Sequence, residues 1–146
     1  MNRIFTTIKQ VSATEMSSIE AMSKGYRVNE DSLQIEGYEI TYKDGYKSWC
    51  PKEVFLENAI ISAPEYSYEM PCTENTPGYI VRMHHELNDL REKFIKLGRF
   101  INDDKFKQLD QVQQHLLKLQ HTTMDAYINI LGSRLNYEYD INNIVK

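Results

Sequence analysis

The chain has 146 residues, with Lys+Arg 17 against Asp+Glu 21, so its formal net charge is -4 at pH 7. Apolar side chains make up 41% and charged ones 26%, an ordinary balance for one domain or two small folded units. No apolar run reaches the roughly 20 residues of a membrane-spanning helix, and the N-terminus lacks the apolar core of a secretion signal. We therefore expect a cytoplasmic protein without a membrane partner.

Charge and cysteine usage exclude further classes. A net acidic chain without a cluster of lysines and arginines is poorly suited to duplex DNA, because affinity for DNA depends on neutralising many phosphates. Cys50 and Cys72 are too few for a disulfide framework, and they form no Cys-x-x-Cys pattern. We expect both cysteines to be reduced, and we expect no DNA partner.

The sequence changes character near Gly78. Residues 1–78 hold short β-prone segments between turn-forming residues and have a net charge of -5, whereas residues 79–146 have no proline, an apolar repeat at helical spacing and a net charge of +1. Residues 62–78 mix Pro, Ser, Thr, Asn and Glu without periodicity, as loops do. We predict a small β-containing domain over 1–61, a connecting loop over 62–78, a helical hairpin domain over 79–137 and a tail over 138–146.

In chain order, a β-hairpin is the clearest N-terminal signal. Residues 38–42 alternate between faces, residues 46–49 form a second β-prone segment, and the Asp-Gly pair at 44–45 supplies the positive φ angles of a tight turn. A short helix should follow over 51–57, with its proline in the first turn. Two further elements are predicted, a strand over 4–13 and a turn of helix over 16–24.

The second half of the sequence predicts two helices. Apolar residues over 80–101 are spaced alternately by three and four, which is the pattern of an amphipathic helix. A second run is expected to place on one side Leu109, Val112, Leu116, Leu119, Thr123, Tyr127, Ile130 or Leu131, and Arg134 or Leu135. Asp104 and Asp110 are candidate caps. The fold class is α+β, with a small β-hairpin or sheet unit and a short helix followed by an antiparallel two-helix hairpin. Because isolated helix pairs are marginal, the hairpin is expected to oligomerise.

Enzyme signatures are missing from the sequence. His84 and His85 point about 100° apart on a helix and cannot share a metal unaided, so the alternative is a solvated helix surface. The second histidine of a His-Glu-x-x-His metalloprotease motif is absent, and the scattered glycines form no phosphate-binding loop. We expect no catalytic residue, no metal and no cofactor.

Several cations and aromatic residues could bind a small anionic ligand. Tyr26 and Arg27 follow a glycine in an irregular stretch, and Lys47 and Trp49 lie at the hairpin exit. Arg134 lies near the end of the second helix, at or beside the apolar stripe, where a guanidinium needs an anionic partner. For these residues the alternatives are a core Trp49 and, at position 134, a cation favoured by the helix dipole. Arg82 and Arg99 could act as Arg134 does, with a solvated helix face as the alternative.

Two parts of the chain resemble known phage proteins. Residues 9–16 (KQVSATEM) and 37–55 (GYEITYKDGYKSWCPKEVF) are similar to a small domain common in bacteriophage proteins, whose pattern has serine where Cys50 stands. The second half resembles the helical hairpin shared by the Thoeris anti-defence sponge and the anti-CBASS sponge. That resemblance is carried by Leu90 through Phe94, Leu97, Phe100-Ile101, Phe106, Leu109, Leu116, Gln120, Met124, Tyr127, Leu131 and Arg134-Leu135. The order of the two parts is more similar to the Thoeris sponge.

The resemblance implies sequestration in the host cytoplasm. Such proteins bind the cyclic ADP-ribose isomer made by a bacterial TIR-domain enzyme and do not cleave it, so the host effector stays inactive. Some members also hold cyclic di- or trinucleotides at a separate site in a hexamer. For this chain the resemblance implies a homo-oligomer, either a dimer or a hexamer, in which Arg27 and Arg134 contact the nucleotide.

Two other functions stay open from the sequence. The chain could be an oligomeric protein-interaction module, in which the hairpin assembles protomers and the acidic N-terminal unit inhibits a host protein. It could also be a nuclease-like enzyme that degrades the signal. Reversible binding of intact nucleotide separates the sponge from both.

Overall fold

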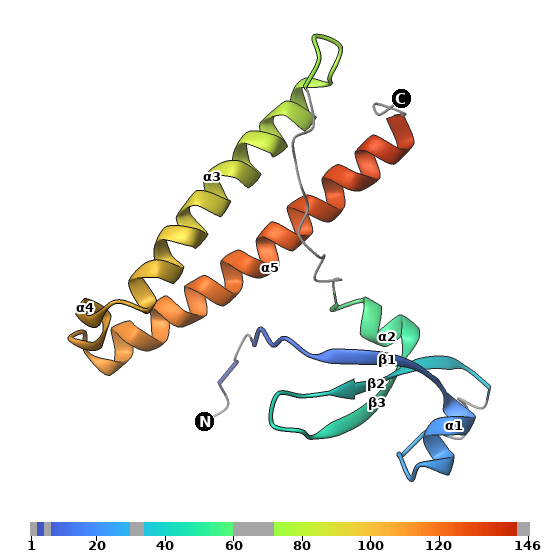
Figure 1. The fold of residues 1–146 in the computed structure, drawn as a ribbon. Coiled ribbons are helices and arrows are strands. Elements are labelled where there is room, and N and C mark those ends of the chain that lie inside the picture. The colour runs from blue at the N-terminus through green and yellow to red at the C-terminus, as the bar shows by residue number, and fades with distance from the viewer. Residues whose placement is uncertain (1–2, 5–6, 30–33, 60–71, 143–146) are drawn as a thin grey trace. The chain divides into compact units, whose positions relative to one another are not determined.

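The computed structural model describes residues 3–4, 7–29, 34–59 and 72–142. The chain forms two compact units, Met1–Ala59 and Ile60–Lys146. Figure 1 shows the elements of each unit. The predicted loop over 62–78 lies largely outside the described residues.

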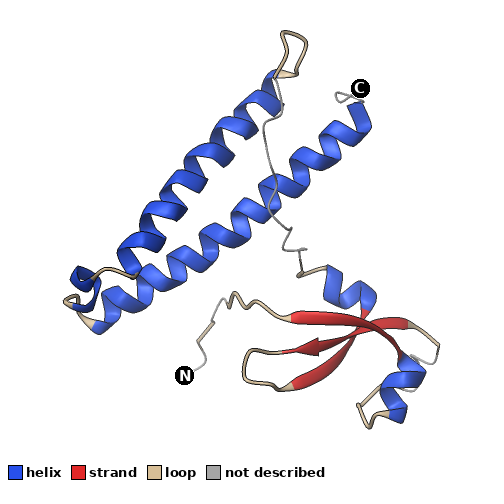
Figure 2. Ribbon diagram, in the orientation of Figure 1, coloured by secondary structure: helices blue, strands red, loops and turns tan. Residues whose placement is uncertain are grey.

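The N-terminal unit is a three-stranded antiparallel sheet with two short helices (Figure 2). Its elements are β1 (Ser12–Ser17), α1 (Ser18–Ser23), β2 (Glu36–Thr41), β3 (Lys47–Pro51) and α2 (Lys52–Leu56). The strands lie in the order β1-β2-β3, so β2 is central and pairs on both sides. The C-terminal unit is the helical hairpin described below, and the predicted α+β class is therefore confirmed.

The predicted β-hairpin is confirmed by the pairing of β2 with β3, although of the Asp-Gly pair only Gly45 has a positive φ. Gly45 has a φ of 85°, a conformation that L side chains rarely adopt. The Tyr46 amide donates to Asp44 Oδ1 at 3.0 Å, and the Tyr42 amide donates to the Tyr46 carbonyl at 2.8 Å. These bonds close the turn and fix the register in which Tyr38 lies opposite Cys50.

The first strand lies further along the chain than predicted. Instead of 4–13, β1 spans Ser12–Ser17, because Met16 pairs with Gly37 and is only 4% exposed. The helical turn predicted over 16–24 accordingly begins later, at Ser18, where the Ser17 hydroxyl accepts from the Glu20 amide at 3.2 Å. Pairing with β2 and burial of Met16 therefore set the limits of β1 more than the local pattern of residues 4–13 does.

Trp49 on β3 contacts residues of both other strands, Met16 of β1 and Gly37 of β2. Its Nε1 donates to the Met16 carbonyl at 3.0 Å, and its ring lies so close to Gly37 that a Cβ there would be 2.5 Å from Trp49 Cζ2. On the other face, the Tyr38 and Phe55 rings pack with centroids 5.0 Å apart, so α2 covers that face. Helix α2 spans Lys52–Leu56, so it begins one residue later than predicted, and Pro51 is its N-cap residue rather than part of its first turn.

The C-terminal unit is an antiparallel helical hairpin (Figure 1). It consists of α3 (Gly78–Ile101), the short α4 (Asp104–Lys107) and the long α5 (Gln111–Asn142), which continues beyond the predicted end of the hairpin domain at 137. Asp103, and not Asp104 as predicted, caps α4, because its carboxylate accepts from the Lys105 amide at 2.8 Å. The predicted cap at Asp110 is confirmed by a 2.9 Å bond from the Gln113 amide.

The hairpin core lies toward the start of α3 and the end of α5. Its buried members are Ile80, Met83, Leu87, Ile128, Leu131, Leu135 and Tyr139. The side predicted for the second helix was therefore partly wrong, because Val112, Leu116 and Leu119 are 67%, 56% and 44% exposed. Leu131 and Leu135 define the inward face of α5, and the earlier leucines lie to one side of it.

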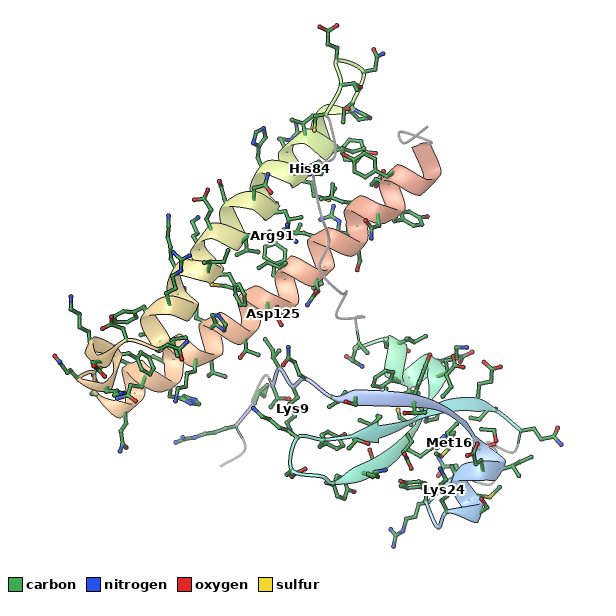
Figure 3. All side chains as sticks on the ribbon, in the orientation of Figure 1. Lys9, Met16, Lys24, His84, Arg91 and Asp125 are labelled. Atoms are coloured by element: carbon green, nitrogen blue, oxygen red, sulfur yellow. The ribbon has the colours of Figure 1, made fainter. Side chains whose placement is uncertain are left out.

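His84 belongs to this core, which corrects the expectation of a solvated surface. It is 7% exposed, and its Nε2 shares a hydrogen bond with the buried Tyr139 hydroxyl (Figure 3). Burial lowers the pKa of His84 and raises that of Tyr139, so the pair is neutral near pH 7. Among the described helices, α3 and α5 included, none has a stretch long and apolar enough to cross a membrane.

Candidate functional site

The residues predicted to bind a ligand are divided between the two units. Tyr26, Arg27, Lys47 and Trp49 lie in the N-terminal unit, and Arg82 and Arg134 lie in the hairpin. Within each unit the structure brings some of them together. The candidate residues therefore form two separate sets of contacts, one in each unit.

In the N-terminal unit, three predicted residues surround Glu39. The Tyr26 hydroxyl donates to Glu39 Oε1 at 2.7 Å, Lys47 Nζ donates to Oε2 at 3.2 Å, and Trp49 pairs with Glu39 across β2 and β3. Lys24 Nζ lies 3.8 Å from the same carboxylate, near the end of α1 (Figure 3). Glu39 was missed from the sequence, although the alternation of 38–42 places it on the face opposite Ile40.

This arrangement weakens the N-terminal unit as an anion site. The bonds from Tyr26 and Lys47 hold the pKa of Glu39 below its ordinary value, so the carboxylate is ionised and occupies the lysine that a phosphate would need. The hydrogen bond to Glu39 also raises the pKa of Tyr26. Arg27 follows Tyr26 in the chain and is exposed. A phosphate arriving here would compete with Glu39 for Lys47.

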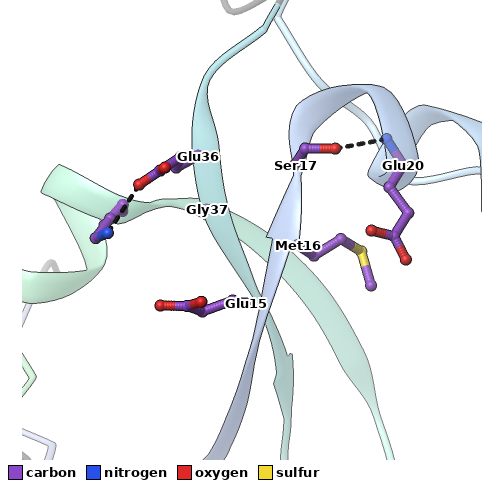
Figure 4. A pocket seen from close by; sticks show the side chains of 7 residues that line it. Glu15, Met16, Ser17, Glu20, Glu36 and Gly37 are labelled. Carbon is purple, nitrogen blue, oxygen red and sulfur yellow. Dashed lines mark hydrogen bonds and ion pairs between the residues drawn. The ribbon is translucent and has the colours of Figure 1, made fainter.

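A pocket of about 260 Å³ lies elsewhere in the N-terminal unit, between β1, β2 and the ends of the two helices (Figure 4). Its lining includes the carboxylates of Glu15, Glu20 and Glu36 and one cation, Lys52. Lys52 Nζ donates to Glu36 at 2.8 Å, which holds the pKa of Glu36 below its ordinary value. Acidic groups outnumber cations, so this pocket also disfavours a phosphate.

The hairpin offers a different surface, where two tyrosine–carboxylate bonds join the helices. The Tyr79 hydroxyl donates to Glu138 Oε2 at 2.6 Å, and the Tyr127 hydroxyl donates to Glu86 Oε1. The second bond raises the pKa of Tyr127, whereas the charge of Arg134 acts in the opposite sense. Arg134 therefore lies within electrostatic reach of the bond between Tyr127 and Glu86.

Helical spacing places both predicted hairpin arginines on this surface. Arg82 follows Tyr79 by three residues and precedes Glu86 by four, and Arg134 follows Tyr127 by seven. Residues at these spacings share one face of a helix. Because the helices are antiparallel and Tyr79 and Tyr127 bond to the opposite helix, Arg82 and Arg134 lie between the two bonds. Both arginines are exposed.

A groove of about 410 Å³ continues from this surface. It is lined by Glu86, Asp89, Leu90, Lys93 and Tyr127, which we call the groove residues. None of them was singled out from the sequence as a ligand contact. The spacing of 86, 89, 90 and 93 could have indicated one face of α3, but only the packing of α5 shows that Tyr127 closes it.

The described part of the chain contains no group of three or more His, Cys, Asp and Glu side chains placed to hold a metal ion. Cys50 and Cys72 are free thiols, and burial raises the pKa of Cys50. Around the two tyrosine–carboxylate bonds of the hairpin, the side chains provide hydrogen bonding, charge and aromatic surface.

Comparison with known proteins gives one match. A family model described as Sequestin matches residues 77–137, which span α3, α4 and most of α5. No curated protein and no solved structure matches the chain. The matched segment is the hairpin that carries Arg82, Arg134 and the groove residues.

Proposed function

We propose that this chain is a bacteriophage anti-defence protein that binds a cyclic ADP-ribose-type signalling nucleotide in the host cytoplasm without cleaving it. Removal of the free nucleotide would block TIR-based Thoeris immunity, and cyclic oligonucleotides are further candidate ligands. The observation that carries the proposal is the Sequestin match over residues 77–137, the segment in which Arg82 and Arg134 share one surface.

The contacts that one protomer offers are too weak to give the affinity that a sponge needs. An effective sponge needs nanomolar affinity, which is roughly -12 kcal/mol. A charge-assisted hydrogen bond contributes about 1.5–3 kcal/mol and a base stacked on an aromatic ring about 1–3 kcal/mol. Two arginines and one stacked base fall short once the entropy of binding is subtracted. We therefore propose that the nucleotide is enclosed between protomers of a homo-oligomer, a dimer or a hexamer.

An apolar stripe on α5 supports this assembly. Val112, Leu116, Leu119 and Ile130 are exposed on the hairpin, at spacings that place them on one side of α5. They lie off the face that packs on α3, so a second surface is needed to remove them from water. A helix–helix contact between protomers would do so.

The proposal is tested by titrating the protein with cyclic ADP-ribose isomers and cyclic oligonucleotides, using Arg134→Ala and the control Arg99→Ala. Arg99 is also exposed, but it lies in the last turn of α3, away from the paired tyrosines. We expect Arg134→Ala to weaken binding at least 10-fold, about 1.4 kcal/mol, and Arg99→Ala to leave it unchanged. An intact chain that binds none of these nucleotides, and is captured instead on a host protein, would favour the interaction module.

A further inference from the structure

The groove residues combine three kinds of chemistry in one place. Glu86 and Asp89 supply hydrogen-bond acceptors, Leu90 and the ring of Tyr127 supply apolar surface, and Lys93 supplies a cation. The volume of about 410 Å³ is within the range of about 300–1,000 Å³ usual for small-molecule sites. This mixture is suited to a ligand that is itself part sugar, part ring and part anion.

The geometry holds the Glu86 acceptor in position and places Asp89 beside it. Glu86, Asp89 and Lys93 recur at helical spacing on α3, so their side chains leave the same face. Tyr127 approaches from α5, and its hydroxyl donates to Glu86 Oε1. A carboxyl group has two oxygens, and Tyr127 bonds only Oε1, so this bond orients Glu86 and leaves acceptor sites for a ligand. Tyr127 is 38% exposed, so part of its ring faces solvent.

The two carboxylates restrict what can bind beside them. Their charge repels phosphate, and their oxygens only accept hydrogen bonds, so the adjacent part of the ligand must be neutral and rich in donors. The two free hydroxyls of a ribose meet this requirement, as they do where an acidic residue binds the ribose in dinucleotide-binding folds. Phosphates would lie toward the cations on either side, Lys93 and Arg134.

We propose that the groove residues bind a ribose with free hydroxyls in a ribonucleotide, with Glu86 and Asp89 accepting from those hydroxyls and Arg134 and Lys93 facing its phosphates. Tyr127 acts as a positioning residue for Glu86, and Leu90 packs against the sugar or base. The inference rests on the proposed nucleotide binding and names the part of the ligand that this groove recognises.

The test compares ribose with 2′-deoxyribose ligands in calorimetric titrations. The probes are cyclic ADP-ribose and ADP-ribose, which keep two free ribose hydroxyls, each with its 2′-deoxy analogue. The variant is Glu86→Gln, which keeps an acceptor for Tyr127 and removes the charge. Glu92→Gln is the matched control, because Glu92 is exposed on the same helix and lies 3.6 Å from Lys96.

We expect the unaltered protein to bind the ribose form of at least one probe at least 10-fold more tightly than its deoxy form, because a site built to bond a hydroxyl rejects the analogue that lacks it. Glu86→Gln should lose most of that preference, and Glu92→Gln should keep it. Asp89→Asn, at an exposed position, repeats the test if Glu86→Gln fails to fold.

The outcomes separate this inference from the proposed function. Two outcomes would overturn the role of the groove and leave sequestration standing. One is tight binding without a ribose preference, and the other is a ribose preference that remains in both Glu86→Gln and Asp89→Asn. Failure of the unaltered protein to bind any probe overturns the role of the groove, whereas binding of another cyclic nucleotide in the wider panel would still support sequestration.

Discussion

Replacing Gly37 with alanine should selectively destabilise the N-terminal unit. The new Cβ would lie 2.5 Å from Trp49 Cζ2 and 2.6 Å from the Cys50 carbonyl oxygen, so the ring or the strand must move. Overpacking of this kind costs about 1–3 kcal/mol. Displacing the ring also breaks the bond from Trp49 Nε1 to the Met16 carbonyl, worth about 1 kcal/mol. We expect a total loss of about 2–4 kcal/mol.

The loss should be large relative to the stability of this unit. A unit the size of Met1–Ala59 is expected to have a free energy of unfolding of about 3–9 kcal/mol. Trp49 is the only tryptophan in the chain, so its fluorescence reports the N-terminal unit, whereas far-UV circular dichroism reports mainly the hairpin helices.

Urea unfolding of Gly37→Ala should therefore shift the fluorescence transition and leave the dichroism transition of the hairpin in place. Gly78→Ala is the control, because its Cβ would meet only Arg82 Nη1 at 3.5 Å, an ordinary contact. A fluorescence transition within about 0.5 kcal/mol of the unaltered protein would refute the close packing of Trp49 on Gly37.

Three further predictions concern the hairpin. Burial lowers the pKa of His84, so the unfolded chain binds a proton at this residue more readily than the folded chain does. The free energy of unfolding should therefore be unaffected above the ordinary pKa of 6.5 and should decrease as the pH drops below it. His84→Gln should reduce the difference between the free energies of unfolding measured at about pH 7.5 and about pH 5.5. Leu131→Ala removes a fully buried side chain and should cost about 2–5 kcal/mol by dichroism, whereas Lys96→Ala on the exposed surface should change stability by less than about 0.5 kcal/mol. Leu116→Asp should convert the proposed oligomer into monomers in sedimentation velocity, and an unchanged sedimentation coefficient would exclude the α5 stripe as the contact.

Local sequence signals predicted the elements that are stabilised by contacts between residues close together in the sequence. The Asp-Gly turn, the alternation around Ile40, the apolar repeat of α3 and the cap at Asp110 all depend on neighbours within a few residues. These features correspond to the confirmed β-hairpin and helical hairpin. Their success reflects agreement between local preference and final packing.

Elements fixed by distant contacts were predicted less well. The limits of β1 depend on pairing of Met16 with Gly37. The inward face of α5 is set by the packing of Leu131 and Leu135 on α3, and the earlier stripe of Val112, Leu116 and Leu119 lies off that face. His84 looked like a surface residue because its partner, Tyr139, is 55 residues away.

The candidate site shows the same division. The arginines at 82 and 134 could be selected from their helical positions, but Glu39 as the partner of Lys47 and Tyr127 as the partner of Glu86 required the fold. A carboxylate that bonds a candidate residue changes what that residue can bind. That information lies in pairs of side chains far apart in the sequence.

A release assay tests the central claim most directly. The purified protein is mixed with cyclic ADP-ribose isomers and cyclic oligonucleotides, freed of unbound nucleotide, denatured by heat, and the supernatant is analysed by chromatography and mass. Sequestration predicts that one nucleotide disappears on mixing and returns chemically intact, in stoichiometric amount, only after heating. Nucleotides that remain free throughout, or that return as cleaved products, would contradict it.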